Sequence, residues 1–185
     1  MYDIRVAIID PDNNSSKKIK EQLIATGHMV VAEAVDGRAG LRYISQTQPD
    51  VILLSIALGT ETVKIIEEQR IAPVIIIATD IKWLESLKTI CLFGLITPGM
   101  GDLLLEATVQ IAIQNFNRLR QLEQEVKSLK VTLEERKVIE QAKGLLMEKR
   151  GLSESKAFQY MRKLAMDKCV PMVKVARAII KMLHD

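Results

Sequence analysis

Five short apolar segments, each followed by a helical pattern, most constrain what the first 105 residues can fold into. The segments lie at residues 5–10, 29–34, 50–55, 73–79 and 94–97. Apolar residues at helical spacing follow at 15–26, 37–47, 61–70, 81–93 and from 101 onward. Strands that are apolar along their whole length are typical of a parallel sheet with helices on both faces. The sequence therefore predicts an α/β domain with a five-stranded parallel sheet.

A single long helix is predicted from residue 103 to residue 150, because this stretch holds no proline and one glycine, Gly144. Within it, apolar residues alternate at spacings of three and four: Leu119, Leu122, Val126, Leu129 and Leu133. This heptad pattern predicts a coiled-coil linker over residues 105–136 that joins two copies of the chain as a parallel homodimer. The alternative is an amphipathic helix packed on its own domain.

Two further helices are predicted after Gly151, which ends the long helix. Ser153 suits the N-cap of the first, and Pro171 suits the first turn of the second. Their apolar stripes are Ala157, Met161, Leu164 and Ala165, and then Val173, Ala176, Ile179, Ile180 and Leu183. A three-helix module this small buries little surface, so we expect it to pack on the long helix or on a second subunit.

The charge is unevenly divided along the chain. Residues 1–109 hold 10 basic and 14 acidic residues, a net charge of −4, whereas residues 136–185 hold 12 and 5, a net charge of +7. A basic C-terminal segment suits a polyanionic partner. The alternative is that its lysines only solvate helix faces.

The sequence predicts a cytoplasmic protein. No stretch approaches the roughly 20 apolar residues that span a bilayer, and no signal peptide is visible at the N-terminus. Cys91 and Cys169 lie far apart without metal-ligand spacing, as expected for reduced intracellular thiols.

Ser55 ends the third predicted strand, in the stretch "DVILLSIALG", and raises the question of nucleophilic catalysis. No G-x-S-x-G motif surrounds it, and the two histidines, His28 and His184, lie in a loop and near the C-terminus. Four aspartates could serve as strand-end acids for Mg²⁺: Asp10, Asp12, Asp36 and Asp80. They complete no constellation, so the sequence predicts no enzyme, no cofactor and no metal.

Residues 3–115 resemble the receiver domain of two-component response regulators, which implies a flavodoxin-like fold. The stretch "VAIIDPDN" corresponds to their paired acids, and "PDVILLSIALG" corresponds to the strand with the phospho-accepting aspartate. The stretches "PVIIIAT" and "LITPG" correspond to the strands with the switch hydroxyl and the Lys-Pro pair. The first departure is in the paired acids, because Pro11 follows Asp10 and displaces Asp12 by one position.

Three further departures fall on positions that carry receiver chemistry. Ser55 replaces the phospho-accepting aspartate, and Thr97 replaces the lysine. Ala78 replaces the switch hydroxyl, with Thr79 one position late. Phosphoryl transfer to a carboxylate needs the carboxylate, a metal site and a cation. The sequence therefore predicts a pseudo-receiver domain over residues 1–115 that is not switched by aspartyl phosphorylation.

The stretch "VIEQAKGLLMEKRGLSESKAFQYMRKLAMDKCVPMVKVARAII" resembles the ANTAR domain, an RNA-binding antitermination module, over residues 130–185. The order of pseudo-receiver, coiled coil and ANTAR domain is similar to that of the amidase-operon antitermination regulators. The resemblance implies a homodimer that binds stem-loops in a leader mRNA so that a terminator hairpin cannot form. It also implies a sensor protein that sequesters the dimer.

The predicted RNA-binding residues share helix faces. They are Arg136, Lys143, Gly144, Met147 and Arg150 on the long helix, Lys156, Tyr160 and Lys163 on the next, and Lys174 and Arg177 on the last. Basic side chains can neutralise phosphates, and a tyrosine can stack on an unpaired base. A glycine inside a helix costs about 1 kcal/mol relative to alanine, so Gly144 predicts close approach of a ligand or a neighbouring helix.

Other functions remain open for the basic module. Its faces could instead be solvated surface, and Tyr160 could be a packing residue. A DNA-binding transcription factor would prefer a palindromic duplex to RNA. A protein-interaction adaptor would bind an acidic partner without nucleic acid.

Overall fold

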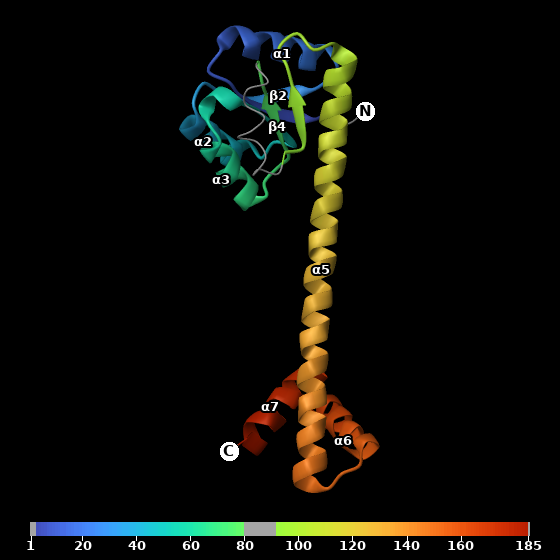
Figure 1. The fold of residues 1–185 in the computed structure, drawn as a ribbon. Helices are drawn as coiled ribbons and strands as arrows, with labels where there is room; N and C mark the ends of the chain where they lie inside the picture. The colour runs from blue at the N-terminus through green and yellow to red at the C-terminus, as the bar shows by residue number, and fades with distance from the viewer. Residues whose placement is uncertain (1–2, 80–91, 185) are drawn as a thin grey trace. The chain divides into compact units, whose positions relative to one another are not determined.

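The computed structural model describes residues 3–79 and 92–184 (Figure 1). It divides into two compact units, Met1–Arg120 and Gln121–Asp185. The helix predicted at 81–93 falls largely outside the described residues, as does Cys91. The domain boundaries 1–115, 105–136 and 130–185 stay predictions.

The first unit contains the predicted five-stranded parallel sheet, in the order β2-β1-β3-β4-β5. Its strands are β1 (Arg5–Ile9), β2 (Met29–Ala34), β3 (Val51–Ser55), β4 (Val74–Ile77) and β5 (Gly94–Ile96). Every residue of β3 and β4 is buried, which explains why these two segments are apolar throughout. The fold class predicted from the sequence is confirmed.

Helices cover both faces of this sheet (Figure 1). The first face carries α1 (Asn13–Ala25) and the start of α5 (Asp102–Arg150), through buried residues such as Leu23 and Val109. The second carries α2 (Gly37–Thr47) and α3 (Glu61–Gln69), through Ile44 and Ile66. Ile24 has helical spacing with Ile19 and Leu23, but it is 56% exposed and lies off the buried face of α1.

Polar contacts fix the start of α5 against α1 and β2. Gln22 Nε2 on α1 donates to Met100 O at 2.7 Å and to Asp102 Oδ1 at 2.8 Å. His28, which is buried just before β2, pairs through Nε2 with Glu106 Oε2 on α5. These contacts tie segments that are about 80 residues apart in sequence into one domain.

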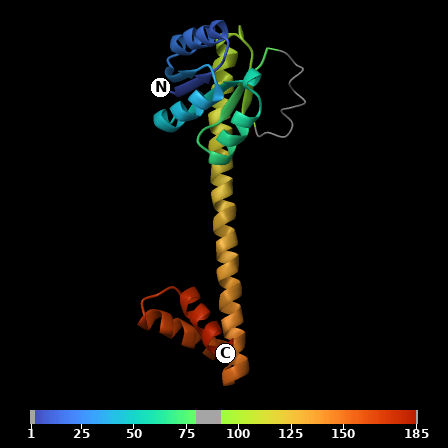
Figure 2. The ribbon, with the colours of Figure 1, turned by 90° about the vertical axis from the view of Figure 1, so that its left-hand side faces the viewer.

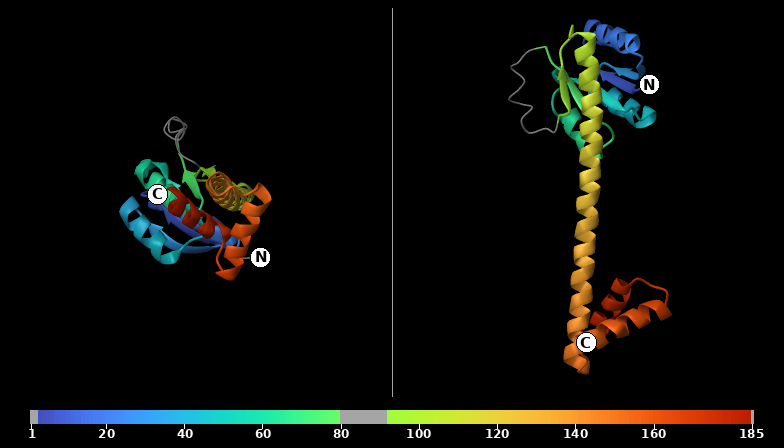
Figure 3. Two further views of the ribbon diagram at one scale, coloured as in Figure 1. Left: turned by 90° about the horizontal axis from the view of Figure 1, so that it is seen from below. Right: turned by 90° about the vertical axis from the view of Figure 1, so that its right-hand side faces the viewer.

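The second unit packs α6 (Glu154–Asp167) and α7 (Met172–His184) beside the C-terminal part of α5, as Figure 2 and Figure 3 show. Its core holds Ala142, Leu146, Ala157, Met161, Val175, Ala176 and Ile179. The predicted N-cap is confirmed, since Ser153 Oγ accepts from Lys156 N at 3.4 Å. Gly151, at φ +64°, follows the last residue of α5 as predicted. Pro171 precedes α7 rather than lying in its first turn.

The middle of α5 lacks any covering layer. Every side chain from residue 121 to residue 134 is exposed, including Leu122, Val126, Leu129 and Leu133. An amphipathic helix packed on its own domain would bury this stripe, whereas here it is exposed; the coiled coil stays a prediction.

Glu106 gives the first unit a testable pH dependence. Burial raises the pKa of Glu106, but hydrogen bonds from Gln110 and His28 and the charge of His28 together hold it below its ordinary value. Such a carboxylate stabilises the fold above its unfolded pKa, and the contribution is lost as pH falls through the folded pKa.

We therefore expect Glu106→Gln to lower the free energy of unfolding at neutral pH and to approach wild type below about pH 4. Urea unfolding followed by circular dichroism at several pH values measures this. Glu68→Gln, at an exposed position on α3, is the control. A constant difference between Glu106→Gln and wild type across this range would contradict the account.

Candidate nucleic-acid interface and the altered receiver pocket

The carboxyl ends of the strands meet at one edge of the sheet, where open α/β folds place their functional groups. Ser55, at the end of β3, is 7% exposed and directly precedes the short 3-10 helix η1 (Ile56–Leu58). Its register partner on β4 is Ile77. A buried hydroxyl therefore stands at this strand end, where a receiver would present a carboxylate.

The two acids near β1 make separate contacts. Asp12 is exposed and is the N-cap of α1, because its Oδ1 accepts from Asn14 N at 2.9 Å. Asp10 is 2% exposed, and its Oδ1 accepts from Asp12 N at 3.1 Å. Across residues 3–79 and 92–184, no group of three or more His, Cys, Asp or Glu side chains could hold a metal ion.

The other receiver positions carry no replacement chemistry. Ala78 is buried and has no hydroxyl, while Thr79 beside it is exposed. Thr97, at the end of β5, is exposed and carries no charge. At the described ends of β3 and β5, Ser55 and Thr97 thus stand where receivers have the accepting carboxylate and the lysine that would meet the charge on a phosphoryl group.

The predicted RNA-binding residues are mostly on the surface of the second unit. Those classed as exposed are Arg136, Gly144, Met147, Arg150, Lys156, Lys163, Lys174 and Arg177. Tyr160 is half-buried, and the Lys143 side chain is 12% exposed. The predicted set is therefore not one uniform basic face.

Lys143 joins two helices instead of facing solvent. Its Nζ lies 2.6 Å from Glu140 Oε2 on α5 and 2.8 Å from Glu154 Oε1 in the first turn of α6. Hydrogen bonds to Glu140 and Glu154 raise the pKa of Lys143, and the bond to Lys143 lowers that of Glu154. Two carboxylates therefore compensate its charge in this structure, and its role in RNA binding stays a prediction.

Gly144 is exposed, and a Cβ added there would meet no described atom within 4 Å. The prediction that a neighbouring helix approaches this backbone is therefore wrong for the described part of the single chain. The prediction of a ligand contact stays open.

Tyr160 contacts Arg150 and also borders a cavity that Lys174 lines. The Arg150 guanidinium lies 5.7 Å from the centre of the Tyr160 ring, and its Nη1 donates to the Tyr160 hydroxyl at 3.4 Å. Tyr160 and Lys174 border a cavity of about 330 Å³ between α6 and α7. Tyr160 thus packs partly against the core of the second unit and partly lines a cavity that lysine side chains also line.

The sequence analysis named none of five further residues that line this cavity: Lys168, Val170, Val175, Ala178 and Met182. Lys168 is the C-cap of α6, and Met182 is largely exposed on α7. The sequence feature that could have pointed to Lys168 is a further lysine at the end of a predicted helix. Met182 follows the apolar spacing of α7 without belonging to its buried stripe, so no pattern singled it out.

Comparison with known proteins defines the class to which these features belong. Residues 127–180 match the ANTAR domain family model. The signal receiver domain of a modulated diguanylate cyclase from Desulfovibrio desulfuricans superposes with a TM-score of 0.58 at 21% identity, covering 63% of this chain and 98% of that one. The chain therefore carries an ANTAR domain in its second unit and a receiver-like fold in its first.

Two relatives share its sequence more directly. The transcriptional regulatory protein PdtaR of Mycobacterium tuberculosis is 28% identical over 97% of this chain and 90% of that protein. The nitrate regulatory protein of Klebsiella oxytoca is 49% identical over 36% of this chain, and the matched part covers 17% of that protein's length.

No helix in the described residues is long and apolar enough to cross a membrane.

Replacing Lys143 tests its structural role. Lys143→Met should lower the melting temperature of the second unit's transition by a few degrees, because Glu140 and Glu154 lose their shared partner. Because folding raises the pKa of Lys143, its contribution to stability is fully present at pH values below the unfolded-state pKa, which include neutral pH. The contribution is lost as the pH rises through the folded-state pKa.

The matched control is Lys137→Met, which removes an exposed pair with Glu134 on the same helix. Exposed pairs at this spacing contribute little, so the control should melt like wild type. Equal effects of the two substitutions, measured by circular dichroism, would show that Lys143 is only a surface charge.

Proposed function

We propose that this chain is an RNA-binding transcription antitermination regulator. Its second unit would bind stem-loops in a leader transcript and so prevent a terminator hairpin from forming. The observation that carries the proposal is the ANTAR match at 127–180, which covers most of the strongly basic segment of the chain. The two relatives, a transcriptional regulatory protein and a nitrate regulatory protein, agree with a regulatory role.

Exposed cations support binding to a polyanion. Lys156 and Lys163 lie on α6, and Lys174 and Arg177 lie on α7, all on the surface of one small unit. Such side chains contribute affinity by releasing counterions from phosphates. The Tyr160 ring beside the cavity offers a surface on which an unpaired loop base could stack.

The exposed heptad stripe of α5 supports a homodimer. Fully burying one leucine or valine side chain is worth about 1.5–3 kcal/mol, and four such side chains are exposed along residues 122–133. A parallel coiled coil would bury them and would place two ANTAR domains in one particle. Two linked modules can hold two stem-loops with a higher affinity than either module alone.

The proposed control is independent of aspartyl phosphorylation. The buried Ser55 hydroxyl supports this, because an alcohol cannot form an acyl phosphate, and the Asp12 carboxylate already caps α1. A sensor protein that sequesters the dimer remains our proposal for the input.

A substitution in the heptad stripe tests the dimer. Leu129→Lys places a charge at a predicted d position, and we expect the chain to become monomeric in light scattering coupled to gel filtration. Val131→Lys is the matched control, because Val131 is similarly exposed on the same turn but occupies an f position outside the stripe. A dimer that survives Leu129→Lys, or that Val131→Lys also dissociates, would contradict the coiled coil.

Removing a cation tests the RNA surface. Lys163→Ala should weaken binding to a leader RNA with two stem-loops by about three- to tenfold and should lower the salt slope by about one. Lys17→Ala, at an exposed position on α1, should bind like wild type. Fluorescence anisotropy at several salt concentrations measures both, and equal losses would indicate non-specific attraction.

Incubation with acetyl phosphate and Mg²⁺ tests the altered receiver. We expect no acid-labile phosphate on the protein, by mass spectrometry, and no change in RNA affinity. A receiver domain with an intact aspartate serves as the positive control. Phosphate on Asp10 or Asp12 that also changes RNA binding would overturn this part of the proposal.

A further inference from the structure

The cavity of about 330 Å³ between α6 and α7 has a mainly apolar lining. Its apolar residues are Leu164, Val170, Val175, Ala178, Ile179 and Met182. Val175 and Ile179 also belong to the core of the second unit, whereas Ala178 and Met182 are exposed, so the apolar wall is open to solvent. Protein cavities that hold small organic ligands measure about 300–1,000 Å³ and combine apolar walls with a few polar groups.

Two lysines supply the charge of this cavity. Lys168 is the C-cap of α6 and Lys174 lies in the first turn of α7, so both flank the short connection between these helices. Neither ammonium group has an ion pair or a hydrogen bond with any of the described residues. Because the described lining contains no acid, these charges favour an anion at this end of the cavity.

Charge and apolar surface are separated along the cavity. Tyr160 precedes Lys168 by eight residues, and Met182 follows Lys174 by eight residues. Eight helical residues rise about 12 Å, so the lining runs from a cationic end to an end formed by Tyr160 and Met182. There the Tyr160 hydroxyl already accepts from Arg150, which does not line the cavity. An extended carbon chain with one anionic head group has the same division of charge.

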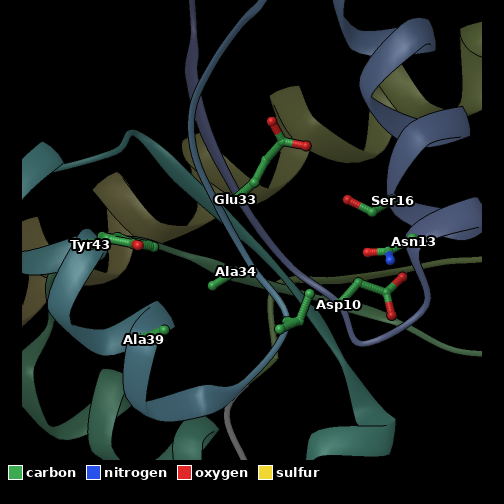
Figure 4. A pocket seen from close by; sticks show the side chains of 8 residues that line it. Asp10, Asn13, Ser16, Glu33, Ala34, Ala39 and Tyr43 are labelled. Carbon is green, nitrogen blue, oxygen red and sulfur yellow. The ribbon is translucent and has the colours of Figure 1, made fainter.

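A cavity of about 240 Å³ in the first unit has the opposite charge, as Figure 4 shows. Its walls come from β1, β2, α1 and α2, and Asp10 and Glu33 are among its lining residues. The other lining residues are neutral, so an anion would be repelled there. Of these two cavities, the one between α6 and α7 therefore suits an anionic ligand.

We propose that the cavity between α6 and α7 binds an amphipathic carboxylate, a carboxylate group on an unbranched hydrocarbon chain of medium length. The carboxylate would accept hydrogen bonds from Lys168 and Lys174, and the chain would lie against Val175 and Ile179. Occupancy would cover Tyr160 and Lys174, so the ligand would compete with RNA. The binding is independent of the proposed RNA function, and only the competition rests on it.

Isothermal titration calorimetry of the full chain with sodium octanoate tests the binding. We expect saturable binding with a Kd of roughly 0.1–1 mM and a negative heat-capacity change, because apolar surface is buried. Acetate has the head group without the chain, and octylammonium has the chain with the opposite charge. Each should bind at least about tenfold more weakly than octanoate. Methyl shifts of Val175, Ile179 and Met182 in NMR spectra would locate the site.

Matched variants make the test specific. Lys168→Met removes a cation that is outside the predicted RNA-binding set, and it should weaken octanoate binding about three- to tenfold. Lys181→Met makes the same change at an exposed position on α7 outside the cavity lining, and it should bind like wild type. Ala178→Phe should fill the cavity and abolish binding. Because Ala178 is exposed, this variant should keep its fold, which circular dichroism checks.

Fluorescence anisotropy with the leader RNA tests the competition. Saturating octanoate should weaken RNA binding to the wild-type chain at least about threefold. It should leave the RNA affinity of Ala178→Phe unchanged, because the cavity of this variant is filled. An RNA affinity of the wild-type chain that octanoate does not change would overturn the competition.

Three calorimetric results would overturn the binding itself. They are absence of saturable octanoate binding, equal binding of acetate or octylammonium, and binding that Lys168→Met and Ala178→Phe leave unchanged. If the chain binds no RNA, the proposed RNA function fails, while the calorimetry still decides whether the cavity binds a carboxylate. The failures of the two proposals are therefore distinguishable.

Discussion

The exposed apolar stripe of α5 is the constraint on which the rest of this molecule depends. From residue 121 to residue 134 every side chain of the helix is exposed, yet it carries a leucine or valine at each heptad position that would face a coiled-coil partner. A lone helix of this kind gains nothing from those side chains. The proposed second chain would bury this stripe, and such a dimer would present two ANTAR domains to a paired target.

The receiver-like unit keeps its fold while its chemistry is altered residue by residue. The buried apolar strands preserve the sheet, and contacts such as Gln22 to Asp102 keep α5 attached to it. At the strand ends, however, Asp12 caps a helix and a serine stands where an aspartate would accept phosphate. The energetics of the fold and the chemistry of the pocket are thus separable.

Sequence patterns predicted the sheet, most helix limits and the basic module, because these depend on local periodicity and on capping residues such as Ser153 and Gly151. They could not predict that Lys143 is held by Glu154, since that contact exists only once α6 folds back on α5. They also missed the exposure of Ile24 and the cavity beside Asp10, whose walls come from four separate elements. Tertiary packing decided each of these cases.

Transcription read-through tests the central claim most directly. A single-round assay would use a leader template from the chain's own genome, with tandem stem-loops ahead of an intrinsic terminator. We expect the purified chain to raise the fraction of full-length transcript, and we expect scrambling the loop bases to abolish the effect. Read-through that the chain leaves unchanged, or that rises equally on the scrambled template, would contradict an RNA-binding antiterminator.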